Sequence, residues 1–156
     1  MELVFKIAEE TDAGKLLEFM RDFYEYDRIR FDAGLARAAL EGIINNGSRG
    51  RVWLIQLGGE PVGYAVLTLG YSLEFHGRDA FLDELYIVEA HRGRGIGRQA
   101  LLLAEKACGE LQVNALHLEV GRENVNAQAF YRKVGFQDHD RYLMTKRIAP
   151  KTGNGK

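Results

Sequence analysis

The chain has 156 residues, of which 46% are hydrophobic, 28% are charged and two are proline. This length fits one domain, and the composition is that of a folded protein rather than of a disordered chain. The formal net charge of −1 argues against nucleic acid as the main partner, because duplex binding usually needs a broad basic face.

The cysteine content and the ends of the chain bear on its compartment. Cys108 is the only cysteine, so no disulfide can form within the chain, and its helical spacing from apolar neighbours predicts a small core residue. Residues 1–11 lack a signal-peptide pattern, and no apolar run reaches the roughly 20 residues of a membrane span. We expect a cytoplasmic protein with no membrane partner, a single domain over residues 1–149 and a disordered polar tail, residues 150–156.

The first elements in the chain are a strand and two helices. Residues 3–8 predict a short strand, and Thr11 or Asp12 then caps a helix. Its apolar residues recur on one face: Leu16, Leu17, Met20, Phe23 and Tyr24. A second helix is expected over residues 32–44, ending at the turn signal of residues 45–48.

The middle of the chain is rich in strand signals. Residues 51–57 and 61–73 are β-rich runs separated by Gly58-Gly59-Glu60, which predicts a tight hairpin. Another strand is expected over residues 79–90, and it leads into a loop rich in glycine and arginine, residues 91–98. An amphipathic helix follows the loop.

The last third predicts a strand at residues 115–120, a helix at residues 124–134 that Gly135 ends, and strands from Phe136 to residue 148. The resulting order is β-α-α-β-β-β-α-β-α-β-β. This order is typical of an α/β (α+β) fold with helices on both faces of a central, mainly antiparallel mixed sheet of six to seven strands.

The glycine and arginine loop is the most informative feature of the sequence. Its glycines, Gly93, Gly95 and Gly97, leave backbone amides open to an anion, and the following helix would aim its N-terminal N–H groups at the same place. The glycine spacing is not that of a dinucleotide fingerprint, and no Lys-Ser or Lys-Thr pair closes a phosphate loop. We expect a site for a phosphate-bearing cofactor; a solvent-exposed strand-to-helix turn is the alternative.

Two motifs resemble signatures of the GNAT superfamily of N-acetyltransferases. Arg92-x-x-Gly95-x-Gly97, which follows the strand-like LDELYIV, is similar to the family's acetyl-CoA signature. A downstream set is similar to its second signature: Asn124, Ala127, Tyr131, Gly135 and Phe136. The resemblance is closest to the diamine and polyamine (spermidine/spermine-like) acetyltransferase branch, and it implies the GNAT three-layer fold and acetyl-CoA as cofactor.

The implied reaction moves an acetyl group to a primary amine of a small cationic substrate, by direct attack in a ternary complex. The substrate would be a diamine, a polyamine or a lysine-like amino acid. Two alternatives stay open: a protein or peptide N-acetyltransferase acting on an N-terminus or a lysine, and a non-catalytic acetyl-CoA-binding sensor. A homodimer is a further option, because relatives often pair through their C-terminal strands.

The resemblance also implies which residues line the cofactor. Backbone N–H groups of the loop would bind the pyrophosphate, and the N–H of Val88 would stabilise the oxyanion. The implied cofactor set is Tyr86, Ile87, Val88, Arg92, Gly93, Arg94, Gly95, Ile96, Gly97, Arg98, Asn124, Ala127 and Tyr131. Tyr131 is the implied general acid, since a phenol with a pKa near 10 can protonate a departing thiolate. A packed helix tyrosine is the alternative.

Two neighbouring acids, Asp83 and Glu84, lie on the strand before the loop. Strand alternation sends them to opposite faces, so only one faces the cleft unless a bulge intervenes. In the related enzymes a carboxylate on this strand takes a proton from the substrate ammonium or binds that cation. We prefer Glu84 as base and keep Asp83 as the alternate; an exposed or cross-strand paired acid is the other interpretation.

The acceptor amine is expected to contact the acidic and aromatic segment of residues 23–32. The candidates there are Glu25, Tyr26 and Asp27, acting with Asp83 and Glu84 through charge pairing and cation–π contact. A solvated acidic helix face explains the segment equally well. The four histidines, His76, His91, His117 and His139, are dispersed without metal-ligand spacing, so we predict no metal.

Overall fold

The computed structural model describes residues 1–148. The chain forms two compact units, Met1–Glu119 and a second unit that begins at Val120. That residues 1–149 form a single domain stays a prediction. The predicted disordered tail, residues 150–156, lies outside the described residues.

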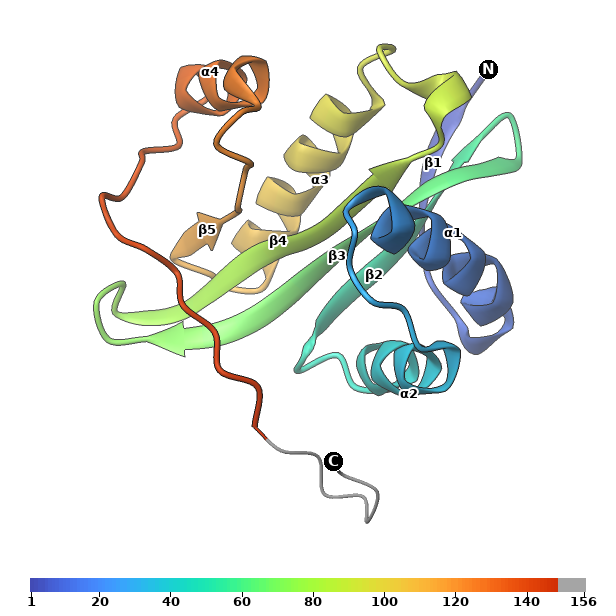
Figure 1. The fold of residues 1–156 in the computed structure, drawn as a ribbon, viewed down its shortest axis with the longest axis horizontal. Helices are drawn as coiled ribbons and strands as arrows, with labels where there is room; N and C mark the ends of the chain where they lie inside the picture. Colours follow the sequence, from blue (N-terminus) through green and yellow to red (C-terminus); the bar gives the residue numbers. More distant parts are fainter. Residues whose placement is uncertain (149–156) are drawn as a thin grey trace. The chain divides into compact units, whose positions relative to one another are not determined.

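The first unit contains one five-stranded sheet in the order β1-β2-β3-β4-β5 (Figure 1). The strands are β1 (Leu3–Ile7), β2 (Gly50–Leu57), β3 (Glu60–Ser72), β4 (Gly77–Ile87) and β5 (Ala115–His117). The first four pair antiparallel, whereas β5 is parallel to β4 and pairs with it over Asp79–Phe81. The predicted mixed, mainly antiparallel sheet is confirmed.

The turn between β2 and β3 shows why the sequence folds locally as it does. Leu57 pairs with Glu60, and the two residues between them, Gly58 and Gly59, have φ of 60° and 83°. Left-handed backbone at both central positions matches the right-handed twist of the flanking strands, and glycine adopts it without steric cost. The predicted hairpin is confirmed.

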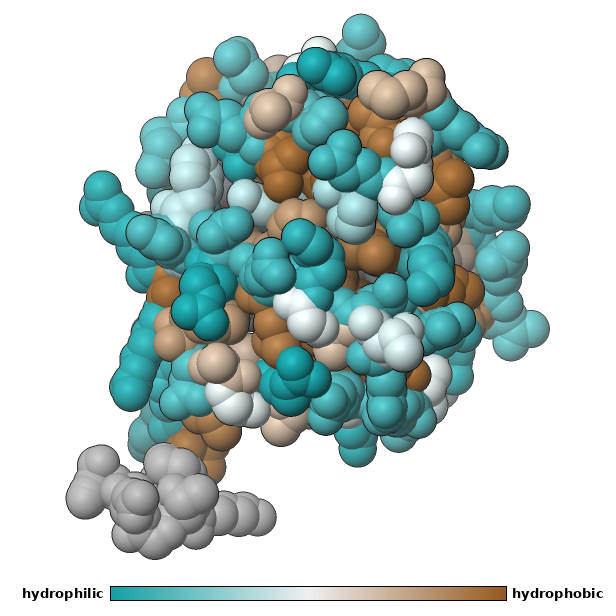
Figure 2. All heavy atoms as spheres, turned by 90° about the vertical axis from the view of Figure 1, so that its right-hand side faces the viewer, coloured by the Kyte–Doolittle hydropathy of each residue, from teal (hydrophilic) through white to brown (hydrophobic). Residues whose placement is uncertain are grey.

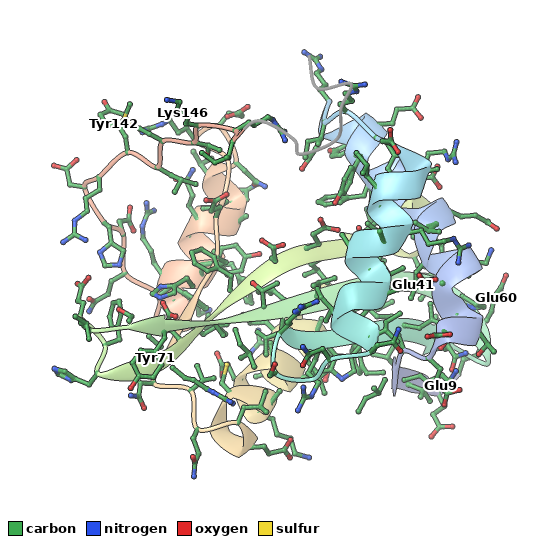
Figure 3. The ribbon with its side chains drawn as sticks, turned by 90° about the horizontal axis from the view of Figure 1, so that it is seen from below. Glu9, Glu41, Glu60, Tyr71, Tyr142 and Lys146 are labelled. Carbon is green, nitrogen blue, oxygen red and sulfur yellow. The ribbon has the colours of Figure 1, made fainter. Side chains whose placement is uncertain are left out.

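Helices cover both faces of this sheet. A short 3-10 turn, η1 (Glu10–Asp12), leads into α1 (Ala13–Tyr26), which packs with α2 (Ala33–Ile44) on one face. The core on this side joins helix residues Leu16, Phe19, Met20 and Leu40 to strand residues Val52, Leu54, Tyr64 and Val66. The third helix, α3 (Ile96–Glu110), contacts β4 and β5 on the opposite face (Figures 1 and 3).

Local capping and burial agree with most of the sequence expectations. Asp32 caps α2 by accepting a 3.0 Å hydrogen bond from the Leu35 amide. Asp12 stands at the start of α1, but its carboxylate instead pairs with the Lys6 ammonium at 2.8 Å. Cys108 is buried on α3, so its assignment as a core residue is confirmed.

The second unit contains one helix, α4 (Val125–Lys133), within its described residues. Gly135 follows with a φ of +111°, which confirms the predicted helix and its end. The two strands predicted from Phe136 onwards are wrong, because residues 136–148 form no regular strand. The strand predicted over residues 115–120 covers only the three residues of β5. The sheet therefore has five strands, not six to seven.

The physical reason is that a strand needs a partner. Residues 137–148 are exposed, and no ladder is formed there to satisfy their N–H and C=O groups. The strand propensity of these residues predicted strands, but no neighbouring strand pairs with them within the described residues.

Hydrophilic side chains dominate the face that carries β1 and α1, with hydrophobic residues scattered between them (Figure 2). Within residues 1–148, no helix is long and apolar enough to cross a membrane.

Candidate active site

A β-bulge on β4 decides where the two neighbouring acids lie. Val66 on β3 pairs with Glu84, but the next residue, Leu67, pairs with Leu82, so Asp83 is an extra residue in the strand. Such a bulge breaks the simple alternation of side chains between the two faces. The regular alternation that would send the two acids to opposite faces is therefore interrupted at Asp83.

Glu84 lies on the sheet face covered by α1 and accepts two hydrogen bonds from tyrosines. The Tyr24 hydroxyl on α1 donates to Oε2 at 2.5 Å, and the Tyr64 hydroxyl on β3 donates to Oε1 at 2.6 Å. Tyr64 is fully buried, and Phe23 and Phe31 pack edge-on against the Tyr64 and Tyr24 rings. Both oxygens of this carboxyl are thus fixed by phenols set in an aromatic cluster.

The environment shifts the pKa of every member of this group. Burial raises the pKa of Glu84 above its ordinary value, although the two phenol donors oppose that rise. Burial also raises the pKa of Asp83, and the Asp83 charge raises the pKa of Glu84 in turn. Burial and the Glu84 carboxylate raise the pKa of Tyr24 and Tyr64, which keeps both phenols protonated as donors. The site therefore contains two carboxyls with a raised pKa, those of Asp83 and Glu84.

Tyr24 and Tyr64 were not expected as partners of Glu84. The sequence pattern puts Tyr24 on the apolar face of the first helix and Tyr64 in a β-rich run. A signal existed, because a partly buried carboxyl needs hydrogen-bond donors, and tyrosine carries one on an otherwise apolar ring.

The glycine loop lies between β4 and α3. Gly93 and Gly95 have φ of 77° and 81°, and no other atom lies within 4 Å of the position that a Cβ would take on either. Gly95 directly precedes α3, and within residues 1–148 the amides from Gly93 to Gly97 donate to no backbone carbonyl. The side chain of Ile96 is buried, whereas Arg94 and Arg98 are exposed. Open amides at the N-terminus of a 15-residue helix form a suitable cradle for a phosphate group.

The arginine that opens the loop is held by the protein itself. The Arg92 guanidinium lies 5.4 Å from the ring centroid of Tyr26 and 5.6 Å from that of Tyr86. Its Nε donates to the Ile87 carbonyl at 2.7 Å, and its amide donates to the Glu89 carbonyl at 3.2 Å. The open amides of the loop therefore begin at Gly93, one residue later than expected.

The expected place of Val88 in the cofactor site stays a prediction, but its N–H is not free to stabilise an oxyanion. Its N–H already donates to the Val62 carbonyl at 2.9 Å, which occupies the proposed oxyanion donor. Because successive amides of a strand point to opposite edges, the N–H groups of Leu85 and Ile87 point away from β3. That edge of β4 is covered by β5 only as far as Phe81.

The three acceptor candidates lie at the end of α1. Tyr26 is the last residue of the helix and is 71% exposed, and Glu25 and Asp27 beside it are exposed as well. The structure brings Tyr26 to Arg92, whereas Tyr24 from the same helix reaches Glu84.

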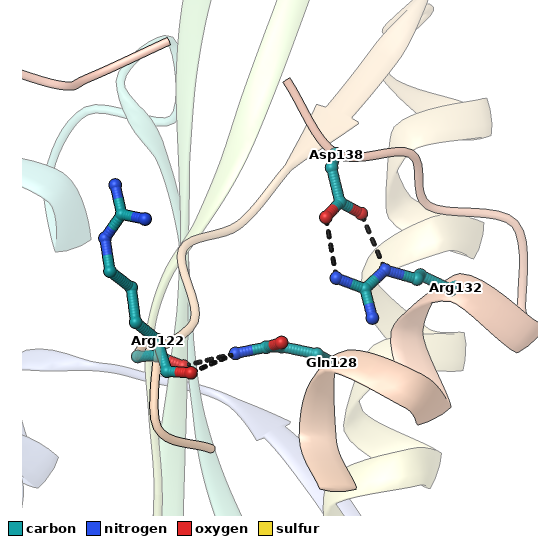
Figure 4. Close-up of polar contacts among 5 residues, drawn as sticks. Arg122, Gln128, Arg132 and Asp138 are labelled. Atoms are coloured by element: carbon teal, nitrogen blue, oxygen red, sulfur yellow. Dashed lines mark hydrogen bonds and ion pairs between the residues drawn. The ribbon is translucent and has the colours of Figure 1, made fainter. Parts of the chain in front are cut away.

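The second unit holds the remaining predicted residues on α4. Asn124 caps the helix, since its Oδ1 accepts a 3.2 Å hydrogen bond from the Ala127 amide. Two further contacts fix the helix: Gln128 donates to the carbonyls of Gly121 and Arg122, and Arg132 forms a two-bond ion pair with Asp138 (Figure 4).

Tyr131 lies on this helix and packs edge-on against Phe136, with ring centroids 5.7 Å apart. Burial raises the pKa of Tyr131, so its phenol keeps its proton at neutral pH.

Residues 13–136 match the acetyltransferase (GNAT) family. This chain belongs to the GNAT family of acetyltransferases. The match spans both the carboxyl-bearing strand β4 with its glycine loop and the helix α4.

Individual relatives and solved structures are similar to this chain over most of its length. The thialysine N-epsilon-acetyltransferase of Bos taurus is 25% identical over 148 residues, covering 87% of this GNAT chain and 85% of the relative. An integron cassette protein from the mobile metagenome of Cole Harbour Salt Marsh is 32% identical with a TM-score of 0.82, covering 94% of this chain and 91% of that one. A predicted acetyltransferase of Clostridium acetobutylicum, solved with acetyl-CoA, shares the fold at 16% identity and a TM-score of 0.78, covering 93% and 96% of the two chains.

The GNAT assignment makes this protein an acetyl-CoA-dependent N-acetyltransferase. The glycine loop fits that cofactor, because the left-handed Gly93 and Gly95 leave open space and unbonded amides beside the helix start.

Proposed function

We propose that this enzyme acetylates a primary amine of a small cationic substrate: a diamine, a polyamine or a lysine-like amino acid. The observation that carries the proposal is the pair of acids at the bulge in the strand before the glycine loop, where the Asp83 charge is near enough to raise the pKa of Glu84. Two adjacent carboxyls attract a cation, and a second ammonium on the substrate would strengthen that attraction. The name of the bovine relative, a thialysine N-epsilon-acetyltransferase, agrees with a lysine-like acceptor.

The two carboxyls are suited to different tasks. Both oxygens of Glu84 accept hydrogen bonds from phenols, so its carboxyl is held in one position and is proposed to orient the ammonium. The Asp83 side chain is accessible to solvent, and partial desolvation by the surrounding protein atoms raises its pKa, which suits a group that takes a proton from the amine. We therefore propose Asp83, the alternate in the sequence reasoning, as the base.

Bound acetyl-CoA supplies the acyl group as a thioester. The open amides of the glycine loop are proposed to bind its phosphates. The N–H groups of Leu85 and Ile87 on the open edge of β4 replace Val88 as proposed donors to the oxygen on which negative charge develops. Tyr131 is proposed as the acid that protonates the thiolate; the family motif and its protonated phenol support this role.

The direct test is CoA release from acetyl-CoA by the purified protein, measured as new thiol against protein-only blanks that account for Cys108. The panel contains diamines, polyamines, lysine, thialysine, aminoglycosides and short peptides, with monoamines of matched length as controls. We expect turnover with a diamine or a lysine analogue and a much weaker reaction with the monoamine. Turnover with peptides alone would overturn the proposal in favour of a protein-directed enzyme. A chain that binds acetyl-CoA but acetylates no amine in the panel would contradict it as well.

A further inference from the structure

Arg92 sits at the junction of three elements of the first unit. Its guanidinium contacts Tyr26 in the last turn of α1 and Tyr86 near the end of β4, while its backbone leads directly into Gly93 of the loop. A planar guanidinium stacks on aromatic rings, and an ammonium does not reproduce this geometry. Arg92 thereby links a helix to a strand that lies about 60 residues further along the chain.

The same side chain fixes the end of β4. The peptide between Ile87 and Val88 is held from both sides, because its N–H donates to Val62 at 2.9 Å and its carbonyl accepts from Arg92 Nε at 2.7 Å. The next turn is closed by the His91 amide, which donates to the Val88 carbonyl at 2.9 Å. The direction in which the chain enters the glycine loop is therefore set by contacts that include Arg92.

We propose that Arg92 is a positioning residue that holds the end of α1 against the start of the glycine loop, rather than a partner of a cofactor phosphate. Its Nε already donates to the Ile87 carbonyl, and its guanidinium already lies over the rings of Tyr26 and Tyr86. One part of this proposal rests on the proposed function: that the end of α1, which carries Glu25 and Tyr26, contacts the substrate amine.

A phosphate-free thioester separates the two roles. We would measure kcat and KM of the wild type, Arg92→Ala and Arg92→Lys with acetyl-CoA and with S-acetylpantetheine, which lacks the phosphates. For a positioning residue we expect Arg92→Ala to lower kcat/KM roughly tenfold with both thioesters, and Arg92→Lys to restore little of it. A defect that lysine repairs with acetyl-CoA and that vanishes with S-acetylpantetheine would show a direct charge contact with phosphate and overturn the proposal. Arg37→Ala, on the surface of α2, is the matched control.

A binding experiment makes the test independent of the acceptor. Titration calorimetry with CoA would compare Arg92→Ala, Tyr26→Ala and the double variant, after thermal unfolding has shown that each is folded. We expect each single change to weaken CoA binding roughly fivefold and the double variant to be hardly weaker than either, since both remove one contact. Tyr26→Phe, which keeps the ring, should retain the coupling. Additive effects would contradict the link between α1 and the loop, and this readout stays decisive even where the proposed amine is wrong.

Discussion

The hydroxyl of Tyr64 on β3 donates a 2.6 Å hydrogen bond to Oε1 of Glu84 on β4. Tyr64 is fully buried, so water does not compete for that bond. Tyr64→Phe leaves a partly buried carboxylate oxygen without its donor, and we expect the free energy of unfolding to fall by about 1–3 kcal/mol. Urea denaturation at neutral pH measures the change. Tyr71→Phe is the control, because Tyr71 is 79% exposed at the far end of β3 and should change stability by less than about 0.5 kcal/mol (Figure 3).

The raised pKa of Glu84 predicts how stability depends on pH. The folded protein holds this proton at pH values where an unfolded glutamate, with its ordinary pKa of 4.5, has lost it. The contribution of Glu84 is therefore fully present below pH 4.5 and is lost as pH rises through the folded-state pKa. We would measure the free energy of unfolding of the wild type and of Glu84→Gln over this pH range. The free energy of unfolding of the variant should increase relative to that of the wild type as pH rises. A constant difference would mean that the folded-state pKa is not raised.

Asp83 as base predicts a characteristic pH profile for the reaction. Wild-type kcat/KM should rise with pH through the raised pKa of Asp83 and then level off, because only the carboxylate accepts a proton. In Asp83→Asn we expect kcat to fall by roughly 10²-fold and this acidic limb to disappear. Glu60→Gln, on the β2–β3 hairpin, should leave both unchanged. If Glu84→Gln instead lost kcat and the acidic limb of the pH profile while Asp83→Asn kept that limb, the base role would return to Glu84.

The role of Tyr131 as acid is tested by removing one oxygen. Tyr131→Phe keeps the ring that packs against Phe136, so we expect CoA affinity to stay within about twofold while kcat falls by roughly 10²-fold. Calorimetry with CoA and steady-state kinetics separate the two effects. Tyr142→Phe changes a tyrosine that is 81% exposed and serves as control. Unchanged turnover in Tyr131→Phe would remove Tyr131 from the mechanism.

The glycine loop predicts different outcomes at two neighbouring glycines. Gly95 has a left-handed φ of 81°, so Gly95→Ala should strain the loop by about 1 kcal/mol and weaken CoA binding. Gly97 is helical, and an added Cβ would meet only Leu85 Cδ2 at 3.9 Å, an ordinary contact, so Gly97→Ala should fold normally. Gly95→Glu should abolish CoA binding through steric block and charge repulsion. Intact binding in Gly95→Glu would show that phosphate does not approach this loop.

Much of the fold could be predicted because its signals are local. Gly58 and Gly59 specify the β2–β3 turn, and Asp32 caps α2, each through residues within a few positions in the chain. The C-terminal strands were predicted wrongly from the same kind of local signal, since apolar and β-branched residues after Phe136 indicate strand propensity but not a partner.

By itself, the sequence determined the glycine loop, the GNAT motifs and the identity of the two acids on β4, because each depends on residue types at short spacing. Only the tertiary structure decided that a bulge separates Asp83 from the regular alternation, and that Glu84 is bonded by Tyr24 and Tyr64. Those two phenols lie 60 and 20 residues from Glu84 in the chain. Contacts at such separations form when the packing of α1 on the sheet brings distant side chains together, and short-range spacing carries no record of that packing.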